Sequence, residues 1–177
     1  MANLETFKSK VGGGIRPNQF KVNINASAAG VELSDSTFEF LCHASSLPGS
    51  TIGQATVHHR GRAIPLAGDR TFAPWTVTVY ADQNMMIRDK FESWSDRMNT
   101  YDKATGEGDP TGYKGTGTVV LLDRSGDQAL YTYQMQGIFP LDISDIQLSW
   151  QANDVVGEFS VTFAIEKWSS VIGAVAF

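Results

Sequence analysis

Residues 67–80, Ala-Gly-Asp-Arg-Thr-Phe-Ala-Pro-Trp-Thr-Val-Thr-Val-Tyr, carry the clearest strand signal in the chain. From Trp75 to Tyr80, large apolar residues alternate with threonine or tyrosine, so the two sets point to opposite faces of a strand. Both sets favour β structure. The segment therefore predicts a strand at the centre of a sheet, or one that is buried between subunits.

Similar patterns occur on both sides of this strand. Alternation at 20–24 and 159–165 predicts half-buried strands, and Asp-Arg-Ser-Gly-Asp at 123–127 predicts a hairpin turn. Further strands are expected at 51–58, 62–66, 118–122, 129–136 and 146–150, with one ending near Cys42 and a bend at Phe139-Pro140. The predicted fold class is mainly β (β+α), an antiparallel β-sandwich or barrel.

One helix is predicted after the strand at 75–80. Its apolar residues recur at i, i+4, i+7 and i+11 and form one stripe: Ile87, Phe91, Trp94 and Met98. Asp82 or Asn84 is expected to cap its first turn. This helix should pack on the sheet as the one main flanking helix.

The whole chain, residues 1–177, is predicted to form a single domain. Residues 1–14 form a flexible N-terminal arm, with a short helix at 3–10 and a glycine joint at 12–14. Residues 99–117 form a long polar loop, a length that is typical of functional loops. Residues 169–177 form an apolar C-terminal extension, which either covers a groove on a neighbouring subunit, the favoured alternative, or packs on its own domain.

The composition excludes several classes of protein. Hydrophobic content of 42% and charged content of 19% are typical of a folded globular protein, and the net charge of -5 argues against tight nucleic-acid binding. A single cysteine, Cys42, excludes an internal disulfide and favours a small buried side chain. No apolar run is long enough for a signal peptide or a membrane span, so a soluble chain made in a cytoplasm is expected.

No catalytic motif is found. His58 and His59 are adjacent on a predicted strand and point to opposite faces, which disfavours a shared metal ion. The serine in the glycine-flanked segment 49–53 is misplaced for a nucleophile elbow, and 114–118 has the wrong order for a phosphate loop. We therefore predict no catalytic, cofactor-binding or metal-binding residues, and no enzyme activity.

Turns and exposed arginines are the other notable features. Leu47-Pro48-Gly49 predicts a turn, in which the proline presets φ and the glycine takes a positive φ. Bulky replacements of Gly49 or of Gly68 are therefore expected to impair assembly. For Arg60, Arg62 and Arg70 two alternatives stay open: exposed loop charges, or contacts at a subunit interface. The second is possible because a forked arginine guanidinium next to Asp69 can reach a carboxylate on a neighbouring subunit.

Several blocks, in order and over nearly the full length, resemble the tail tube proteins of contractile-tailed bacteriophages. These blocks are 16–20, Arg-Pro-Asn-Gln-Phe; 44–49, Ala-Ser-Ser-Leu-Pro-Gly; 68–79, from Gly-Asp-Arg-Thr-Phe to Trp-Thr-Val-Thr-Val; Phe91 and Trp94; Tyr113-Lys114; 137–140, Gly-Ile-Phe-Pro; 147–150, Gln-Leu-Ser-Trp; and 159–168, Phe-Ser-Val-Thr to Trp. The extension after Trp168 departs from the family, which commonly stops soon after this tryptophan.

The resemblance implies a structural subunit of the inner tail tube. Six subunits would form a ring whose sheets join into a continuous β-lined channel, and stacked rings would conduct DNA into the host on sheath contraction. The implied partners are further copies of the chain, the tail sheath, the tape-measure protein, and the baseplate and tail-terminator proteins, with non-specific passage of DNA and no stable membrane insertion. The implied location is the virion, after assembly in the host bacterial cytoplasm.

The candidate assembly and turn positions are Arg16, Pro17, Phe20, Leu47, Pro48, Gly49, Arg60, Arg62, Gly68, Asp69, Arg70 and Trp75. One alternative is the tube protein of a phage-derived injection particle or of a type VI secretion system, which carries protein effectors. Another is a β-barrel that binds a small molecule, and this alternative requires a closed pocket with convergent polar groups.

Overall fold

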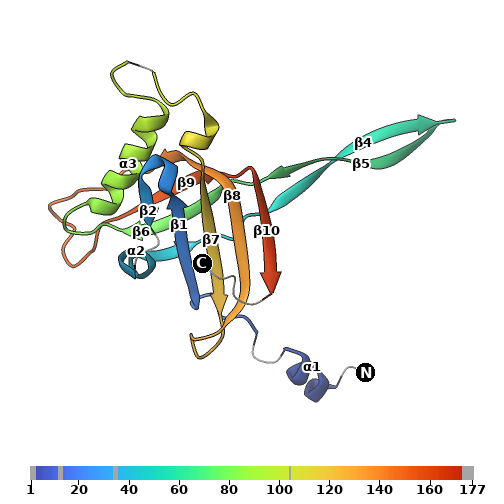
Figure 1. Ribbon diagram of the computed structural model, residues 1–177. Coiled ribbons are helices and arrows are strands. Elements are labelled where there is room, and N and C mark those ends of the chain that lie inside the picture. The colour runs from blue at the N-terminus through green and yellow to red at the C-terminus, as the bar shows by residue number, and fades with distance from the viewer. Residues whose placement is uncertain (1–2, 12–13, 34–35, 104, 173–177) are drawn as a thin grey trace.

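A computed structural model describes residues 3–11, 14–33, 36–103 and 105–172 (Figure 1). The strands are β1 (Phe20–Ala26), β2 (Val31–Leu33), β3 (Cys42–Ser45), β4 (Ser50–His59), β5 (Arg62–Phe72), β6 (Trp75–Tyr80), β7 (Gly115–Leu122), β8 (Ala129–Ile143), β9 (Glu158–Ala164) and β10 (Lys167–Ile172). The α-helices are α1 (Leu4–Val11), α2 (Ser36–Leu41) and α3 (Met86–Met98), and two 3-10 turns lie at Ser27–Ala29 and Pro110–Gly112. The predicted helix at 3–10 matches α1, and two of the three joint glycines, 12 and 13, lie outside the described residues.

Two antiparallel sheets share the long strand β8. Its first part pairs with β7 on one side and β10 on the other, and β1 and β2 extend that sheet beyond β7. Its last part, from Phe139 to Ile143, pairs with β9, which leads to β6 and β3. Gly137 has a φ of +66° between the two parts, a conformation that glycine adopts without strain. The predicted strand at 129–136 therefore continues to Ile143, through Phe139-Pro140.

The core lies between these sheets. Trp75, Val77 and Val79 are fully buried, and Thr76 and Thr78 on the opposite face are partly buried. Because β6 lies between β9 and β3, the prediction of a central strand at 75–80 is confirmed. The predicted antiparallel β-sandwich or barrel is confirmed as well.

Helix α3 covers one side of the core, as its stripe predicts. Its buried residues are Ile87, Phe91 and Trp94. The ring of Phe91 packs edge-on against Phe159 and Phe163, and the Trp94 indole N–H donates to the Tyr113 carbonyl at 2.7 Å. Of the two predicted caps, the Asp82 carboxylate accepts from the backbone N–H of Met86 at 3.0 Å. This contact satisfies a backbone donor that has no partner within the helix.

Two predicted strands are wrong. The segment that leads to Cys42 forms α2, because Phe38 is buried and Leu41 partly buried at helical spacing while Phe40 points to solvent. The alternation at 146–150 produces no strand, and this segment lies in the loop between β8 and β9. The long polar loop ends earlier than predicted, because β7 begins at Gly115.

Cys42 is buried at the start of β3, and burial raises the pKa of its thiol from 9.0 to about 12. At pH 8 its thiolate fraction is then about a thousandfold smaller than that of an unfolded cysteine. We expect native protein to resist alkylation by iodoacetamide and to react fully in guanidinium, as measured by intact mass. Rapid labelling of the native chain would contradict this burial.

Candidate assembly surfaces

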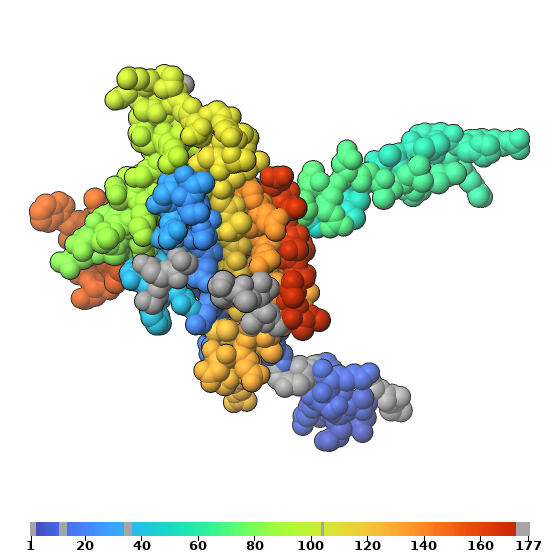
Figure 2. Space-filling view, viewed as in Figure 1, coloured from blue at the N-terminus to red at the C-terminus, as the bar shows by residue number. Residues whose placement is uncertain are grey.

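The two strands β4 and β5 form a ribbon that projects from the sandwich, here called the arm (residues 50–72) (Figures 1 and 2). Its turn is Arg60-Gly61, with φ values of +48° and +80°. Two consecutive positive φ values match the twist of a tight hairpin. Because β4 and β5 pair with each other alone among the described strands, both faces and both edges of the arm are open.

One face of the arm carries an apolar stripe. Val57 pairs with Ile64 and Ala55 pairs with Leu66, and side chains of directly opposed residues share one face. Val57, Ile64 and Leu66 are 45–50% exposed, although each is a large apolar residue. An isolated two-stranded ribbon of this kind is marginally stable in water. A partner that covers the stripe would therefore stabilise the arm.

The base of the arm is held by β10. Phe72 at the end of β5 contacts the Trp168 ring edge-on, with centroids 6.3 Å apart. The Trp168 indole N–H donates to the Gly49 carbonyl at 3.5 Å, and the same carbonyl accepts from Ala73 N–H at 3.0 Å. A tryptophan from the far end of the sequence thus adds to the contacts that hold the base of the arm.

Leu47, Pro48 and Gly49 do not form the predicted turn. They connect β3 to β4 in an extended path, in which Ser46 N–H donates to Thr76 at 3.1 Å and Gly49 accepts from Ala73. Gly49 has no positive φ, so the turn-based reason for its glycine is wrong. Pro48 is buried and Leu47 is exposed. The arm is therefore a continuation of the pairing between β3 and β6.

Gly68 lies inside β5 instead of in a turn. The pairing of β4 with β5 shifts register between Ile52 and Gln54, beside this glycine. A Cβ atom on Gly68 would lie 3.1 Å from the carbonyl carbon and oxygen of Gly53. The two backbones thus approach so closely that a side chain at this position requires the Gly53 backbone to shift, and a close backbone approach is a common reason for glycine within a strand.

Replacing Gly68 by valine is expected to open the arm locally, at a cost of about 1–3 kcal/mol, because the Gly53 backbone must move. Gly49→Ala is the matched control, since a Cβ atom there meets nothing within 4 Å. Hydrogen exchange of the amides of β4 and β5 should rise in the first variant alone. Equal exchange in the two variants would count against the close backbone contact.

The other candidate positions fall into three places. Arg16 and Pro17 lie in an exposed turn, which the Gln19 N–H closes onto the Arg16 carbonyl at 3.1 Å, and Phe20 begins β1. Trp75 is a core residue. The remaining positions, Arg60, Arg62, Gly68, Asp69 and Arg70, all belong to the arm.

The arm arginines are exposed. Arg70 donates to the Ser50 hydroxyl oxygen at 3.0 Å across the base of the arm. Within the described residues, no ion pair includes Arg60, Arg62 or Arg70. Contact with a neighbouring subunit remains a prediction for all three.

A second exposed surface lies in the segment between β8 and β9, here called the knob (residues 144–157). Leu148 is 90% exposed and Trp150 103% exposed, and Val155 and Val156 are also exposed. The alternation at 146–150 predicts a strand for Leu148 and Trp150, and this pattern gives no sign that the two side chains are exposed. Tryptophan is enriched where proteins bind each other, so this exposure marks an interaction surface.

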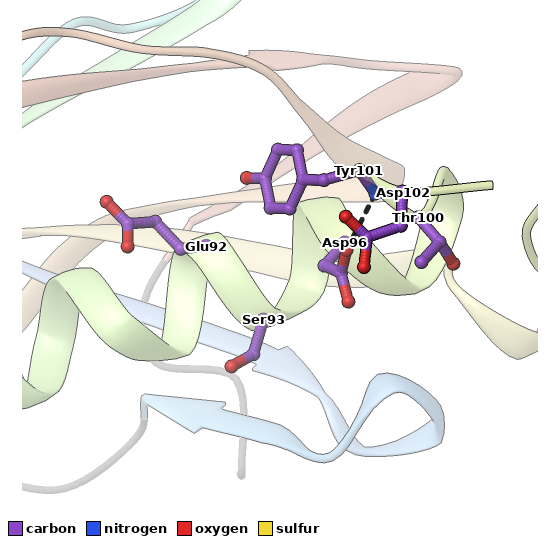
Figure 3. A pocket seen from close by; sticks show the side chains of 6 residues that line it. All are labelled: Glu92, Ser93, Asp96, Thr100, Tyr101 and Asp102. Carbon is purple, nitrogen blue, oxygen red and sulfur yellow. Dashed lines mark hydrogen bonds between the residues drawn. The ribbon is translucent and has the colours of Figure 1, made fainter. Parts of the chain in front are cut away.

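A shallow, open hollow with acidic lining lies at the end of α3 (Figure 3). It is lined by Glu92, Ser93, Asp96, Thr100, Tyr101 and Asp102. The Tyr101 backbone N–H donates to the Asp96 carboxylate at 3.1 Å and folds the chain back over the helix end. In the part of the chain that the structure describes, no group of three His, Cys, Asp or Glu side chains is placed to hold a metal ion, and no helix is long and apolar enough to cross a membrane.

These surfaces define a subunit with interaction surfaces on several sides. The model of the family described as "Phage tail tube protein" matches residues 15–171. The tail tube protein gp19 of Enterobacteria phage T4 is 31% identical over 153 residues, which cover 86% of this chain and 90% of gp19. The tail tube protein of Serratia phage KSP90 is 25% identical over 165 residues, 90% of this chain and 92% of that protein. The chain therefore belongs to the phage tail tube protein family.

Solved structures show the same fold in larger assemblies. A chain in the structure of the PVC sheath/tube terminator of an extracellular contractile injection system, in its extended state, has a TM-score of 0.65 at 13% identity, and the match covers 89% of this chain and 96% of that chain. A chain of the anti-feeding prophage baseplate has a TM-score of 0.65 at 11% identity, and the match covers 87% of this chain and 93% of that chain. These likenesses concern the fold. The family model and the sequence relatives identify a structural subunit of a contractile phage tail tube, a component of the virion.

Proposed function

We propose that six copies of this chain form a ring and that stacked rings form the inner tube of a contractile phage tail. The observation that carries the proposal is the 31% identity to the tail tube protein of phage T4 over 86% of the chain. The exposed arm supports it, because a ribbon with open edges and an apolar stripe gains stability when a neighbouring subunit covers it.

The tube would act as a passive conduit for DNA. The net charge of -5 on each chain suits this role. Clustered lysine and arginine in the channel would bind the DNA phosphates through counterion release and hinder the passage of DNA. The proposed partners are the sheath outside the tube, the tape-measure protein inside it, and the baseplate and terminator proteins at its ends. Assembly takes place in the cytoplasm of the bacterial host, and no step requires enzymatic chemistry.

A tube that carries protein effectors is the second candidate. Solved relatives in the fold include components of the PVC and anti-feeding prophage injection systems, at 11–13% identity. The phage proteins share more of the sequence, 25–31% identity over similar coverage. Sequence similarity therefore favours the DNA-conducting tube.

Electron microscopy of the purified chain at high concentration, with and without a supplied baseplate, tests the proposal. Six-fold rings or hollow tubes are expected. A chain that stays monomeric with the baseplate supplied would overturn the tube proposal and bring a small-molecule binder forward. DNA found inside tubes of virions whose sheath has contracted would separate the phage tube from an effector-carrying particle.

A further inference from the structure

We propose that the arm of one copy docks on the knob of a second copy, in a head-to-tail contact between subunits. This inference rests on the proposed tube, and it names the two surfaces that meet. It is drawn from two features that the fold leaves without intramolecular cover: the apolar stripe of the arm and the exposed apolar side chains of residues 144–157.

The charges of the two surfaces are complementary. The arm carries three arginines and one aspartate, so it is positive in a chain whose net charge is -5. Arg60 and Arg62 stand at its tip, next to His58 and His59. The knob carries Asp145 and Asp154 and has neither lysine nor arginine. Opposite potentials of this kind steer two surfaces together and set their register.

The apolar groups of the two surfaces are complementary as well. The stripe of the arm presents Val57, Ile64 and Leu66 on one face. The knob presents Leu148 and Trp150, and an exposed tryptophan is the type of side chain that carries binding energy at the centre of an interface. Burial of these groups against one another would remove both apolar surfaces from water.

The two surfaces point in opposite directions. In Figure 1 the arm extends to the right of the sandwich and the knob, in orange, lies at the left edge, and Figure 2 shows the same separation. An arm strand of ten residues spans about 33 Å, and it is directed away from the knob of its own chain. A contact between unlike surfaces on opposite sides repeats from copy to copy, and it closes into a ring or continues as a stack.

The arm's other face is the internal control for this contact. Thr56 and Pro65 pair on that face, directly opposite to the stripe, and both are exposed. The acidic hollow at α3 is the competing target for a basic arm tip. It offers carboxylates beside one exposed ring, that of Tyr101, whereas the knob exposes Leu148, Trp150, Val155 and Val156, and we therefore favour the knob.

Disulfide trapping tests the contact. In a Cys42→Ala background, Val57→Cys with Leu148→Cys is expected to give a ladder of covalent multimers on oxidation of assembled tubes. The control pair Thr56→Cys with Leu148→Cys, which places the thiol on the other arm face, should give at least tenfold less ladder. Val57→Cys with Asp96→Cys tests the competing hollow.

Tubes that are intact by microscopy but give no ladder from the Val57 and Leu148 pair would overturn the contact and leave the tube proposal standing. A ladder from the Asp96 pair alone would overturn it too. Absence of tubes from the unmodified chain with a baseplate is a failure of the proposed function instead, and the microscopy of the unmodified chain reports it separately.

A charge exchange keeps the inference testable where a cysteine variant fails to assemble. Arg60→Glu with Arg62→Glu is expected to reduce the tube yield at least tenfold, because like charges then meet Asp145 and Asp154. Asp145→Arg with Asp154→Arg in the same chain should restore the yield. Normal tubes from the first variant, or no recovery in the second while that chain stays folded, would refute the contact.

Discussion

A valine in place of Gly117 is expected to destabilise the fold by about 2–3 kcal/mol, because it forces the two sheets apart. Gly117 lies in β7, and a Cβ atom there would lie 2.6 Å from Cζ3 of Trp75, which projects from β6 in the other sheet. Trp75 is fully buried and its ring also packs on Phe163, with centroids 5.3 Å apart. Neither ring has free space into which it can move.

Thermal and urea unfolding of Gly117→Val would measure the loss. Gly108→Ala serves as the control, because a Cβ atom at that glycine meets nothing within 4 Å. Trp75→Ala alone should cost about 3–5 kcal/mol through the cavity that it leaves. The double variant should lose less stability than the sum of the two single losses, because the valine at 117 can extend into the cavity left by the Trp75 ring. Additive losses would show that the two residues do not meet.

Removal of the outer arm is expected to abolish tube formation and leave the folded subunit intact. Gln54 and Ala67 are paired, so a two-residue Asn-Gly turn can join them and replace 55–66. All of the removed residues are exposed, and their loss should change the stability of the sandwich by no more than about 0.5 kcal/mol. In the assembly that we propose, the arm contributes its surface to contacts with other copies instead.

Circular dichroism melts and electron microscopy of this shortened chain give the two readouts. Arg124→Ala, at the exposed turn between β7 and β8, is a suitable control because it alters a loop charge away from the arm. The control should form tubes like the unmodified chain. Tubes of normal length from the shortened chain would show that the arm has no part in assembly, and a lower melting temperature would show that it supports the fold.

The parts of the fold that face the core were predictable from the sequence. The stripe of Ile87, Phe91 and Trp94 predicts α3, and the alternation from Trp75 to Val79 predicts β6. In both elements, the spacing of the apolar residues matches one buried face, and a prediction from sequence periodicity depends on this match. The Asp82 cap was likewise one of two choices that the sequence offered.

Predictions failed where apolar residues serve a surface instead of the core. Leu148 and Trp150 alternate as a strand would, but they lie in a loop and are exposed, so the pattern misidentified the knob. Such a segment forms a strand only where a neighbouring strand pairs with it, and a single sequence does not show which strands pair. Gly68 is a similar case, since its close approach to Gly53 arises from a pairing across the arm.

Among the candidate site residues, too, some roles were predictable from the sequence and others were not. The sequence singled out Arg60, Arg62 and Arg70 as exposed loop charges or interface contacts, and all three lie on the arm. It gave no indication of the role of Trp168 at the base of the arm, because that contact joins residues far apart in the chain. The described part of the C-terminal extension, residues 169–172, lies in β10 and pairs with β8 of its own chain. A role for the extension in covering a neighbour stays a prediction.

The contact of Trp168 with the base of the arm also has a consequence for synthesis on the ribosome. Trp168 follows Gly49 by 119 residues, so at bacterial translation rates it emerges roughly 6 to 24 s later. During that interval a nascent chain has an arm whose base lacks its contact with Trp168. If the arm docks on a second copy as we propose, this delay would limit association between unfinished chains on neighbouring ribosomes.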